Sequence, residues 1–435
     1  MKTMTIFALS TIEGQSGVAI IRVSGPESKK TIKKITGLNV KPRYATLATI
    51  KTLKGKNIDE GIVIYFPKNK SFTGEEVAEF HVHGSPAITE LLLKELSKIK
   101  GLRHAEGGEF TKQAYINGKL NILQVEGLSN LIKSETENQR KQALKNYFNE
   151  SSKIYLSWLE SLKTALALIE TSIDFSDEEI PRTLIKDSSK IIKGLREKII
   201  KQKKTFKQSK LIKEGIKVVI LGRPNSGKST LINYLSKKEI AIVSNKAGTT
   251  RDLLTQRVDF NGMPVTFYDT AGLRKAKNNI EKEGNKRAYN AAKDADIRIY
   301  LGSNNLIEPF RGIKIENNPQ DIKVINKSDL KKKHKEKPNI TISLKKSFGL
   351  DRLKAKINQK IKELANQHIG PVVSSDREYQ HIVNALGFLT GVNYKDPSIA
   401  SEQIRQAIKE IASISKKTNN EEILDIIFSE FCIGK

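Results

Sequence analysis

The sequence predicts a chain that combines α/β and all-α regions: an N-terminal α/β domain, a split helical bundle, and a second α/β domain inserted into that bundle. Three observations support this. The first hundred or so residues alternate strand-like and helical segments, the stretch from about residue 120 to 200 changes to helical spacing, and an apolar strand at Ile216–Leu221 ends at a glycine-rich loop. At 435 residues the chain is too long for one ordinary core.

The N-terminal region, residues 1–118, is expected to be a compact α/β domain. Its strand-like segments include Gly17–Val23, Gly61–Phe66 and Val77–His83, with proline and glycine punctuation between them. His81 and His83 lie two apart on one strand face, but no third ligand is close in the sequence, so a metal site is disfavoured.

Residues 119–212 are expected to form the first part of the helical domain. Apolar side chains recur every three or four residues, at Tyr155, Trp158, Leu162, Leu166 and Ile169. A basic linker at 201–215 then leads into the inserted domain, residues 213–355. Helical periodicity returns at 357–369 and 401–431, so residues 356–435 are expected to complete the helical domain.

The loop after the first strand of the inserted domain has the full phosphate-loop pattern. Gly222–Ser229 reads Gly-Arg-Pro-Asn-Ser-Gly-Lys-Ser and precedes a helix-prone segment. Lys228 would reach the β- and γ-phosphates and Ser229 would ligate magnesium, which makes a chance glycine-rich turn the disfavoured alternative. The expected phosphate-binding residues are Asn225, Ser226, Gly227, Lys228, Ser229 and Thr230.

Two further segments are expected to sense the γ-phosphate. Asp269, Thr270, Ala271 and Gly272 follow the strand Val265–Tyr268 and supply a carboxylate to the magnesium shell. Upstream, Asn261-Gly262 signals a hairpin that would make an antiparallel edge beside an otherwise parallel sheet. In the loop 248–252, Thr250 could reach magnesium, although an ordinary surface loop is the alternative.

The base site is expected at Asn326-Lys327-Ser328-Asp329, which follows the apolar strand Ile322–Ile325. Asp329 can accept hydrogen bonds from both guanine N1–H and the exocyclic amine, a donor pair that adenine lacks. Ser343, Leu344 and Lys345 would close over the base through backbone N–H groups. The segment 297–304 is interpreted as a weak core strand of the same domain. GTP is therefore the predicted nucleotide.

Hydrolysis needs an unusual water-positioning group, because Leu273 follows Gly272 and an apolar side chain cannot orient water. One candidate is a monovalent cation held by Asn225 and the loop from Ser244 to Thr249. The other candidate is Glu281, although an ordinary solvated charge on a helix is the alternative interpretation of this residue.

Composition limits the remaining classes. No apolar run approaches the roughly 20 residues that span a bilayer, and the first ten residues lack a signal-peptide pattern, so we expect a cytoplasmic protein without a membrane span. Cys432 is the single cysteine, which excludes an internal disulfide. The net charge of +28 favours phosphate-rich partners such as tRNA, although runs such as 201–213 and 331–337 are mostly lysine and a lysine-rich composition is the alternative.

The chain resembles the MnmE (TrmE) family of tRNA uridine-5-carboxymethylaminomethyl modification GTPases over nearly all of its length. The resemblance rests on Gly-Thr-Thr-Arg-Asp at 248–252, Asp-Thr-Ala-Gly-Leu-Arg at 269–274 and Phe-Cys-Ile-Gly-Lys at 431–435, with Ser-Phe-Thr-Gly-Glu at 71–75 and Gly-Glu-Phe at 108–110. The terminal Cys-Ile-Gly-Lys is the most discriminating, because related ribosome-assembly GTPases lack that tail and the N-terminal domain.

The resemblance implies a folate-binding-like N-terminal domain, a Ras-like P-loop GTPase domain and a homodimer. It implies potassium-stimulated GTP hydrolysis and, with the flavoprotein MnmG in a heterotetramer, addition of an aminomethyl-type group to carbon 5 of the tRNA wobble uridine. The one-carbon unit would come from 5,10-methylene- or 5-formyl-tetrahydrofolate, and the amine from glycine or ammonium.

By the same resemblance each site residue has an implied role. The implied catalytic residues are Glu281, which would position water, and Asn225, Lys228 and Gly272. Ser229 and Thr250 would hold magnesium, and Asn225, Ser244, the Lys246 carbonyl and Thr249 would hold potassium. The implied folate-binding residues are Arg22, Glu79, Lys119 and Lys435. Arginine and lysine suit the anionic tail of folate, and a carboxylate suits the amine and N–H edge of its pterin. For each folate residue alone, an ordinary surface charge is the alternative.

Two competing functions remain. A ribosome-assembly GTPase would be a switch without modification chemistry and would not need the N-terminal 120 residues. A structural GTPase scaffold would show negligible, potassium-independent hydrolysis. The role of Cys432 is open, with a packed, buried thiol as one alternative.

Overall fold

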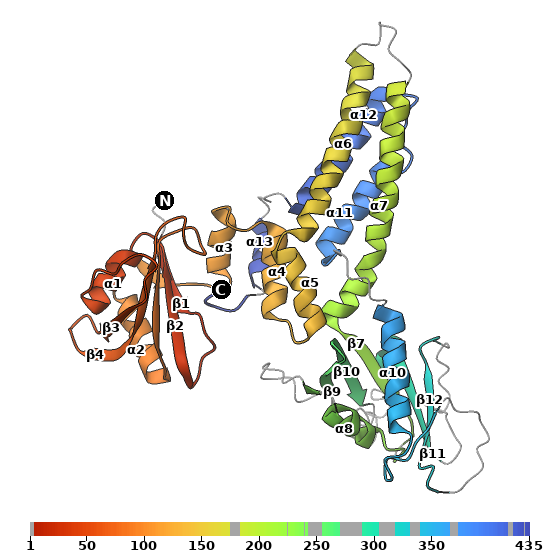
Figure 1. The fold of residues 1–435 in the computed structure, drawn as a ribbon, viewed down its shortest axis with the longest axis horizontal. Coiled ribbons are helices and arrows are strands. Elements are labelled where there is room, and N and C mark those ends of the chain that lie inside the picture. Colours follow the sequence, from red (N-terminus) through yellow and green to blue (C-terminus); the bar gives the residue numbers. More distant parts are fainter. Residues whose placement is uncertain are drawn as a thin grey trace, which may run out of the picture. The chain divides into compact units, whose positions relative to one another are not determined.

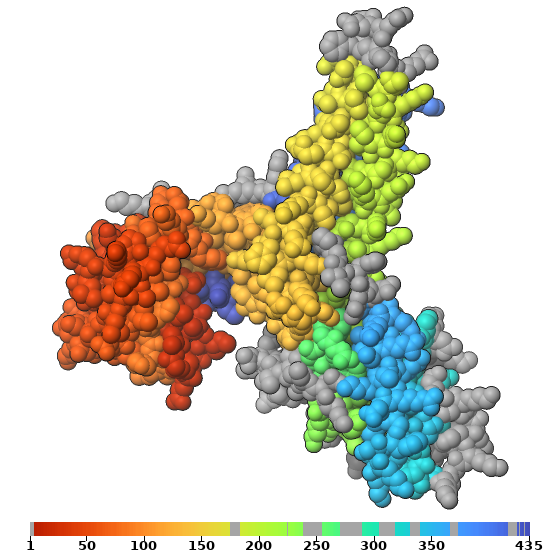
Figure 2. Space-filling model, in the orientation of Figure 1, coloured from red at the N-terminus to blue at the C-terminus, as the bar shows by residue number. Residues whose placement is uncertain are grey.

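The computed structural model describes residues 4–174, 183–223, 225–238, 240–241, 255–269, 289–303, 318–330, 340–365, 373–415, 421–429 and 431–435. The chain forms two compact units. The first contains Met1–Ser129, Asn146–Ser157 and Ile411–Lys435, and the second contains Asn130–Lys145 and Trp158–Glu410 (Figures 1 and 2). Among the described residues, no helix has the length and apolar character that crossing a membrane requires.

The first unit is built on a six-stranded sheet. In chain order its elements are β1 (Thr5–Leu9), β2 (Ser16–Ser24), α1 (Ser28–Thr36), β3 (Thr46–Lys51), β4 (Asn57–Phe66), β5 (Val77–Gly84), α2 (Pro86–Ser97), β6 (Leu102–His104) and α3 (Glu109–Ile116). The strand order is β3-β4-β5-β2-β1-β6, and only the β1–β6 pair among the described neighbours is parallel. The three predicted strands are confirmed as β2, β4 and β5.

The two faces of this sheet differ because side chains alternate along each strand. One face packs Ile21, Val23 and Phe80 against α1 and α2 in a single apolar cluster. The next residues along the same strands point the other way, so Arg22 and Glu79, which are register partners on β2 and β5, share the opposite face. This face carries the N-terminal candidate site.

The C-terminal residues of the chain pack within the first unit. α4 (Ile122–Ile132) and α13 (Glu421–Ser429) share an apolar cluster that includes Val125, Phe428 and Phe431. Ile433 then pairs with Gly107 in an antiparallel bridge, and the C-terminus lies beside α3 and the sheet (Figure 1). The last five residues are therefore held against the N-terminal sheet.

The main helical part of the chain belongs mostly to the second unit, although residues 146–157 and 411–415 belong to the first. Its helices are α5 (Glu137–Tyr147), α6 (Glu150–Asp174), α7 (Thr183–Glu214), α11 (Asp376–Leu389) and α12 (Pro397–Ser415), and α6, α7, α11 and α12 lie side by side (Figure 1). The predicted helical spacing is confirmed, since Trp158, Leu162 and Ile169 are buried.

The prediction of a basic linker at 201–215 is wrong, because α7 continues to Glu214. The apolar face of α7 persists beneath the lysines. Ile199 and Ser209 are buried, and Phe206 stacks on Tyr379 of α11 with ring centroids 4.2 Å apart.

The inserted domain has a seven-stranded sheet. Its elements are β7 (Ile216–Leu221), α8 (Lys228–Lys238), β8 (Ile240–Ala241), β9 (Thr255–Phe260), β10 (Met263–Asp269), β11 (Ile297–Ser303), β12 (Ile322–Asn326), β13 (Ile340–Thr341) and α10 (Leu350–Ala365), in the order β13-β12-β11-β7-β10-β9-β8. β9 runs antiparallel to β10 and β8, and the other pairs are parallel. The predicted hairpin is confirmed, with Asn261 and Gly262 both at positive φ, 55° and 84°.

The core strand predicted at 297–304 is confirmed for its described part as β11, which lies between β7 and β12 with its first six residues buried. Arg298 interrupts the apolar pattern in the sequence. Its guanidinium pairs with Asp321 through two hydrogen bonds of 2.7 and 2.9 Å, so the buried charge is compensated.

Candidate nucleotide site and N-terminal anionic-ligand site

The phosphate loop joins β7 to α8 (Figure 1). Lys228, the first residue of α8, is 5% exposed, and its ammonium donates hydrogen bonds to the Gly222 and Arg223 carbonyl oxygens at 3.1 and 3.0 Å. The loop therefore curls around a buried positive charge next to a helix N-terminus. Both features favour a phosphate anion.

Two residues of the loop have left-handed backbone conformations. Asn225 has φ 60° and Gly227 has φ 101°. A side chain at Gly227 would stand 2.5 Å from the Asn326 amide nitrogen and 2.9 Å from a Leu344 methyl carbon, so the position requires glycine both for its backbone and for space.

The candidate magnesium ligands that the structure describes lie together. Ser229, in the first turn of α8, donates a hydrogen bond of 2.5 Å to Asp269 at the end of β10, and Asp269 is 1% exposed. A hydroxyl and one carboxylate suit magnesium, which takes oxygen ligands and completes its shell with water and phosphate oxygens. The residues present therefore fit the metal that sequence analysis predicted here.

The base-side residues form a hydrogen-bonded connection to the phosphate loop. Asn326 donates from its amide to the Ser226 carbonyl at 2.8 Å, and its amide oxygen accepts from the Leu344 N–H at 3.2 Å. Ser226 itself is fully buried. The sequence predicted Asn326 and Leu344 as base-side residues, but it gave no sign that Asn326 ties the two loops together.

Asp329 is oriented by Ser343. The Ser343 hydroxyl donates a 2.7 Å hydrogen bond to one carboxylate oxygen of Asp329, and this bond holds the pKa of Asp329 below its ordinary value. An ionised, half-buried carboxylate with one oxygen fixed is suited to accept hydrogen bonds from a guanine edge. Lys327, at φ 63°, makes the turn between Asn326 and Asp329, while Thr230 and Lys345 are exposed at the two ends of the site.

Several predicted site residues lie outside the described residues. These are Ser244, Lys246, Thr249, Thr250, Thr270, Ala271, Gly272 and Glu281.

The second candidate site lies on the open face of the N-terminal sheet. Arg22 pairs with Glu79 at 2.9 Å, and His81 contacts the other Glu79 carboxylate oxygen at 3.2 Å. Burial raises the pKa of Glu79, but the His81 hydrogen bond and the Arg22 charge outweigh burial, so the net pKa is lowered and Glu79 is ionised at neutral pH. Sequence analysis missed His81 as an orienting group, because it was considered only as a metal ligand. His83 bonds Asp59 instead, at 2.9 Å.

Aromatic rings flank this face, and the C-terminal tail adds a cation. The Arg22 guanidinium lies 5.8 Å from the ring centroids of both Phe72 and Phe110. Burial and the neighbouring Arg22 charge lower the pKa of Lys435. Phe72 and Phe110 belong to the two N-terminal motifs on which the family resemblance rests, yet sequence analysis assigned them no role.

The tail reaches this face because Gly434 lacks a side chain. Gly434 has φ 93°, and a Cβ there would stand 2.1 Å from the Leu9 carbonyl oxygen. Lys119, the fourth predicted folate residue, bonds a different segment, donating to the Asn69 carbonyl at 2.7 Å. The alternative of a buried thiol is wrong, because Cys432 is exposed.

Half-buried Glu75 forms a polar cluster with the buried Ser24 and Thr73 hydroxyls. Ser24 donates to Glu75 at 2.9 Å and lies 2.8 Å from the Thr73 hydroxyl, and burial raises the pKa of Glu75. The cluster fixes the loop that carries Phe72.

Two family models match the chain. The model described as "MnmE helical domain" matches residues 122–432, and the model described as "GTP-binding protein TrmE N-terminus" matches residues 5–119.

Curated relatives match over nearly the full length. A protein of Parvibaculum lavamentivorans named tRNA modification GTPase MnmE is 38% identical over 440 residues, covering 99% of this chain and 100% of that protein. A protein of Pelagibacter ubique with the same name is 41% identical over 447 residues, covering 99% of this chain and 100% of that protein. The solved G domain of the T. maritima FeoB iron transporter is 23% identical and covers 33% of this chain and 98% of that structure, but its TM-score of 0.24 supports no argument.

Proposed function

The chain belongs to the tRNA modification GTPase MnmE family, and on this basis we propose that its GTP hydrolysis is stimulated by potassium and drives modification of the tRNA wobble uridine together with the flavoprotein MnmG. The protein is a GTP hydrolase of tRNA modification. The finer proposal is that it adds an aminomethyl-type group at carbon 5, as a homodimer that assembles with MnmG into a heterotetramer.

One observation carries this proposal: a guanine-type nucleotide site and an N-terminal face bearing Arg22, Glu79 and Lys435 occur in the same chain. When bound, 5,10-methylenetetrahydrofolate would supply the one-carbon unit at the oxidation level of the product, whereas the 5-formyl form would also require two electrons, which the flavin of MnmG would supply. Arg22 and Lys435 would bind its anionic tail, and ionised Glu79 would accept hydrogen bonds from its pterin edge. A ribosome-assembly switch would not need such a face.

At the nucleotide site, Lys228 would bind the phosphates, Ser229 and Asp269 would hold magnesium, and Asp329 would select guanine. Asn225 is the one proposed potassium ligand among the described residues. It is exposed in the phosphate loop, which suits a residue that would contact a bound cation. Ser244, the Lys246 carbonyl and Thr249 would complete the potassium shell, and Glu281 would position the attacking water.

Reconstitution with omissions tests the proposal. The purified chain, MnmG, unmodified tRNA, GTP, magnesium, potassium, glycine and 5,10-methylenetetrahydrofolate should together give a wobble uridine of increased mass. Leaving out folate, potassium or MnmG in turn should prevent the increase. An increase that persists without folate would contradict the proposed one-carbon source.

Arg22→Ala and Glu79→Gln should each weaken the binding of 5-formyltetrahydrofolate by roughly 10-fold or more, because each removes a hydrogen bond to a charged group, about 1.5 to 3 kcal/mol. Fluorescence titration of the purified chain measures this. Lys30→Ala, a change at an exposed lysine on α1, should leave the affinity unchanged. Wild-type affinity in both site variants would refute the assignment of this face to folate.

The exposed face of α7 is the surface that we expect tRNA phosphates to contact. α7 has eleven basic and three acidic side chains. The exposed lysines that lie at helical spacing opposite its buried face are Lys186, Lys190, Lys193, Lys201, Lys204 and Lys207. Rows of lysines on one helix face are typical of proteins that bind the phosphate backbone of nucleic acids.

Changing Lys193, Lys201 and Lys204 together to glutamate should therefore weaken tRNA binding. The slope of log affinity against log salt should fall by about 2, since each phosphate contact contributes roughly 0.7 to 0.9. Filter binding over a salt series measures the slope. The same triple change at Lys33, Lys34 and Lys41, which are exposed lysines of the first unit, is the charge-matched control. Equal slopes in the two triple variants would exclude α7 as the contact surface.

A further inference from the structure

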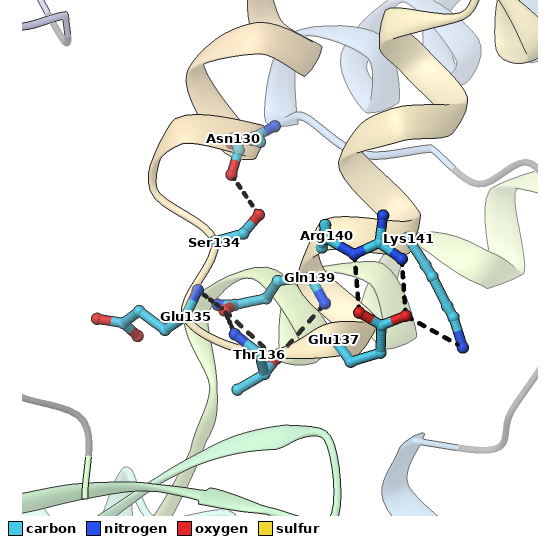
Figure 3. A network of polar contacts seen from close by, with 8 residues as sticks. All are labelled: Asn130, Ser134, Glu135, Thr136, Glu137, Gln139, Arg140 and Lys141. Carbon is cyan, nitrogen blue, oxygen red and sulfur yellow. Dashed lines mark hydrogen bonds and ion pairs between the residues drawn. The ribbon is translucent and has the colours of Figure 1, made fainter.

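Residues Asn130–Lys145, which we call the clamp segment, contact the inserted domain at its β9–β10 hairpin and just before β7. The segment contains the turn after α4 and most of α5, and it belongs to the same compact unit as the inserted domain. Figure 3 shows contacts within the segment: Ser134 with Asn130, Gln139 with the Glu135–Thr136 turn, and Glu137 with Arg140 and Lys141. Glu135, Asn138 and Gln139 also contact residues outside the segment, at the β9–β10 hairpin and before β7.

The clamp segment holds the β9–β10 hairpin by two contacts. Glu135 pairs with Arg257 of β9 at 2.6 Å, with both side chains about one-third exposed. Asn138 lies against the hairpin turn, so closely that a Cβ on Gly262 would stand 3.1 Å from the Asn138 amide nitrogen. The hairpin turn immediately precedes β10, the strand that ends at Asp269.

The same segment also holds the entry to β7. Gln139 is 9% exposed, and its amide donates to the Lys213 carbonyl at 2.9 Å. Its amide oxygen accepts from the Glu135 and Thr136 N–H groups at 2.8 and 3.0 Å, which fixes the turn that presents Glu135 (Figure 3). Lys213 lies three residues before Ile216, where β7 begins. The Gln139 side chain therefore contacts both the residue that leads into β7 and the turn that presents Glu135 to β9.

β7 and β10 are neighbouring parallel strands whose other ends form the phosphate and magnesium positions. Their register pairs Ile216 with Val265 and Ile220 with Asp269. At a rise of about 3.3 Å per residue, Ile216 lies roughly 17 Å from the loop after β7, and Arg257, which is in register with Thr266, lies about 10 Å along the strand from Asp269. The offset between the two strands decides how closely Ser229, which follows β7, meets Asp269, which ends β10.

We propose that Glu135, Asn138 and Gln139 are positioning residues for GTP hydrolysis, which act by fixing β10 relative to β7 and thereby the Ser229–Asp269 pair. The inference rests on GTP hydrolysis at this site and goes beyond it, because it assigns a role in the reaction to a segment outside the nucleotide domain.

Glu135→Arg tests the inference. It places two cations together at the hairpin, and the kcat for GTP should fall by about 10-fold, since a misplacement of 1 Å can cost on the order of 100-fold. The KM for GTP should stay within about twofold, because the phosphate loop and Asp329 are untouched, while the magnesium concentration for half-maximal turnover should rise. Glu135→Arg combined with Arg257→Glu restores the pair in reverse and should recover kcat.

The matched control lies two residues away. Glu137 pairs with Arg140 at 2.8 Å and Lys141 at 3.5 Å, contacts that stay within α5 (Figure 3). Glu137→Arg reverses the same charge and should leave kcat and the magnesium dependence unchanged. If Glu135→Arg does not fold, Arg257→Gln removes the ion pair without placing two like charges together. This variant should also show a lower kcat with a nearly unchanged KM for GTP.

Unchanged kcat in folded Glu135→Arg protein, or a reversed pair that stays as slow as the single variant, would overturn the proposal. So would an equal loss in Glu137→Arg. Failure of wild-type protein to hydrolyse GTP would instead count against the function on which the inference rests.

Discussion

Lys228→Ala should lower the kcat for GTP hydrolysis by on the order of 100-fold or more, the usual effect of removing a group that stabilises charge in a transition state. The Lys228 ammonium is buried beneath the phosphate loop and bonds two loop carbonyl oxygens. When the nucleotide binds, this charge meets the β- and γ-phosphates, where negative charge develops during transfer. Steady-state phosphate release at saturating GTP measures the loss.

Lys237→Ala is the control for Lys228→Ala. Lys237 lies on α8 as well but is exposed in its last turn, so its removal should leave kcat within about twofold, in line with the small effects of surface changes. Turnover at the wild-type rate in folded Lys228→Ala protein would show that hydrolysis takes place without this loop.

Asp329→Asn should weaken GTP binding by roughly 100-fold or more, because a site built to accept two donors from guanine is left with an amide that repels one of them. Ser343 fixes one carboxylate oxygen of Asp329 and keeps the group ionised. Xanthine carries an oxygen where guanine carries its exocyclic amine, so the variant should bind the xanthosine nucleotide better than GTP. Competition against a fluorescent GDP analogue measures both affinities.

Asp351→Asn provides the comparison, because it removes the same charge from the exposed first turn of α10. GTP affinity should be unchanged in that variant. If Asp329→Asn kept wild-type affinity for GTP and gained none for xanthosine triphosphate, the base site would have to lie elsewhere.

Continuous motifs allowed the nucleotide loops to be predicted from the sequence. The phosphate loop and the Asn326–Asp329 segment each lie within a few residues of one strand end, so their spacing alone placed them. The bond from Asn326 to the Ser226 carbonyl joins residues a hundred positions apart and could not be read from either motif.

Charged side chains obscure one helix end and one central strand in the sequence. Lysines obscure the periodicity of Ile199 and Phe206, so the sequence predicts a linker where α7 in fact continues. Arg298 made a central strand look weak, because its partner Asp321 is far along the chain. In both cases a tertiary contact outweighed the local composition.

The N-terminal site depended on the family resemblance. Arg22, Glu79 and Lys435 come from both ends of the chain, and no local pattern joins them. The structure adds Gly434, whose lack of a side chain lets the tail approach Leu9, and His81, which orients Glu79. The clamp segment carries no sequence signature at all, because its contacts are made by single polar side chains in an otherwise ordinary helix and turn.

The most direct measurement is mass spectrometry of wobble nucleosides in tRNA from cells whose own gene for this chain has been deleted. These cells are then given a plasmid with either the wild-type or the Lys228→Ala gene. The account predicts that the aminomethyl-type side chain at carbon 5 is restored by the wild type and absent with Lys228→Ala. Equal modification in the two strains, or modification that never disappeared when the gene was removed, would contradict it.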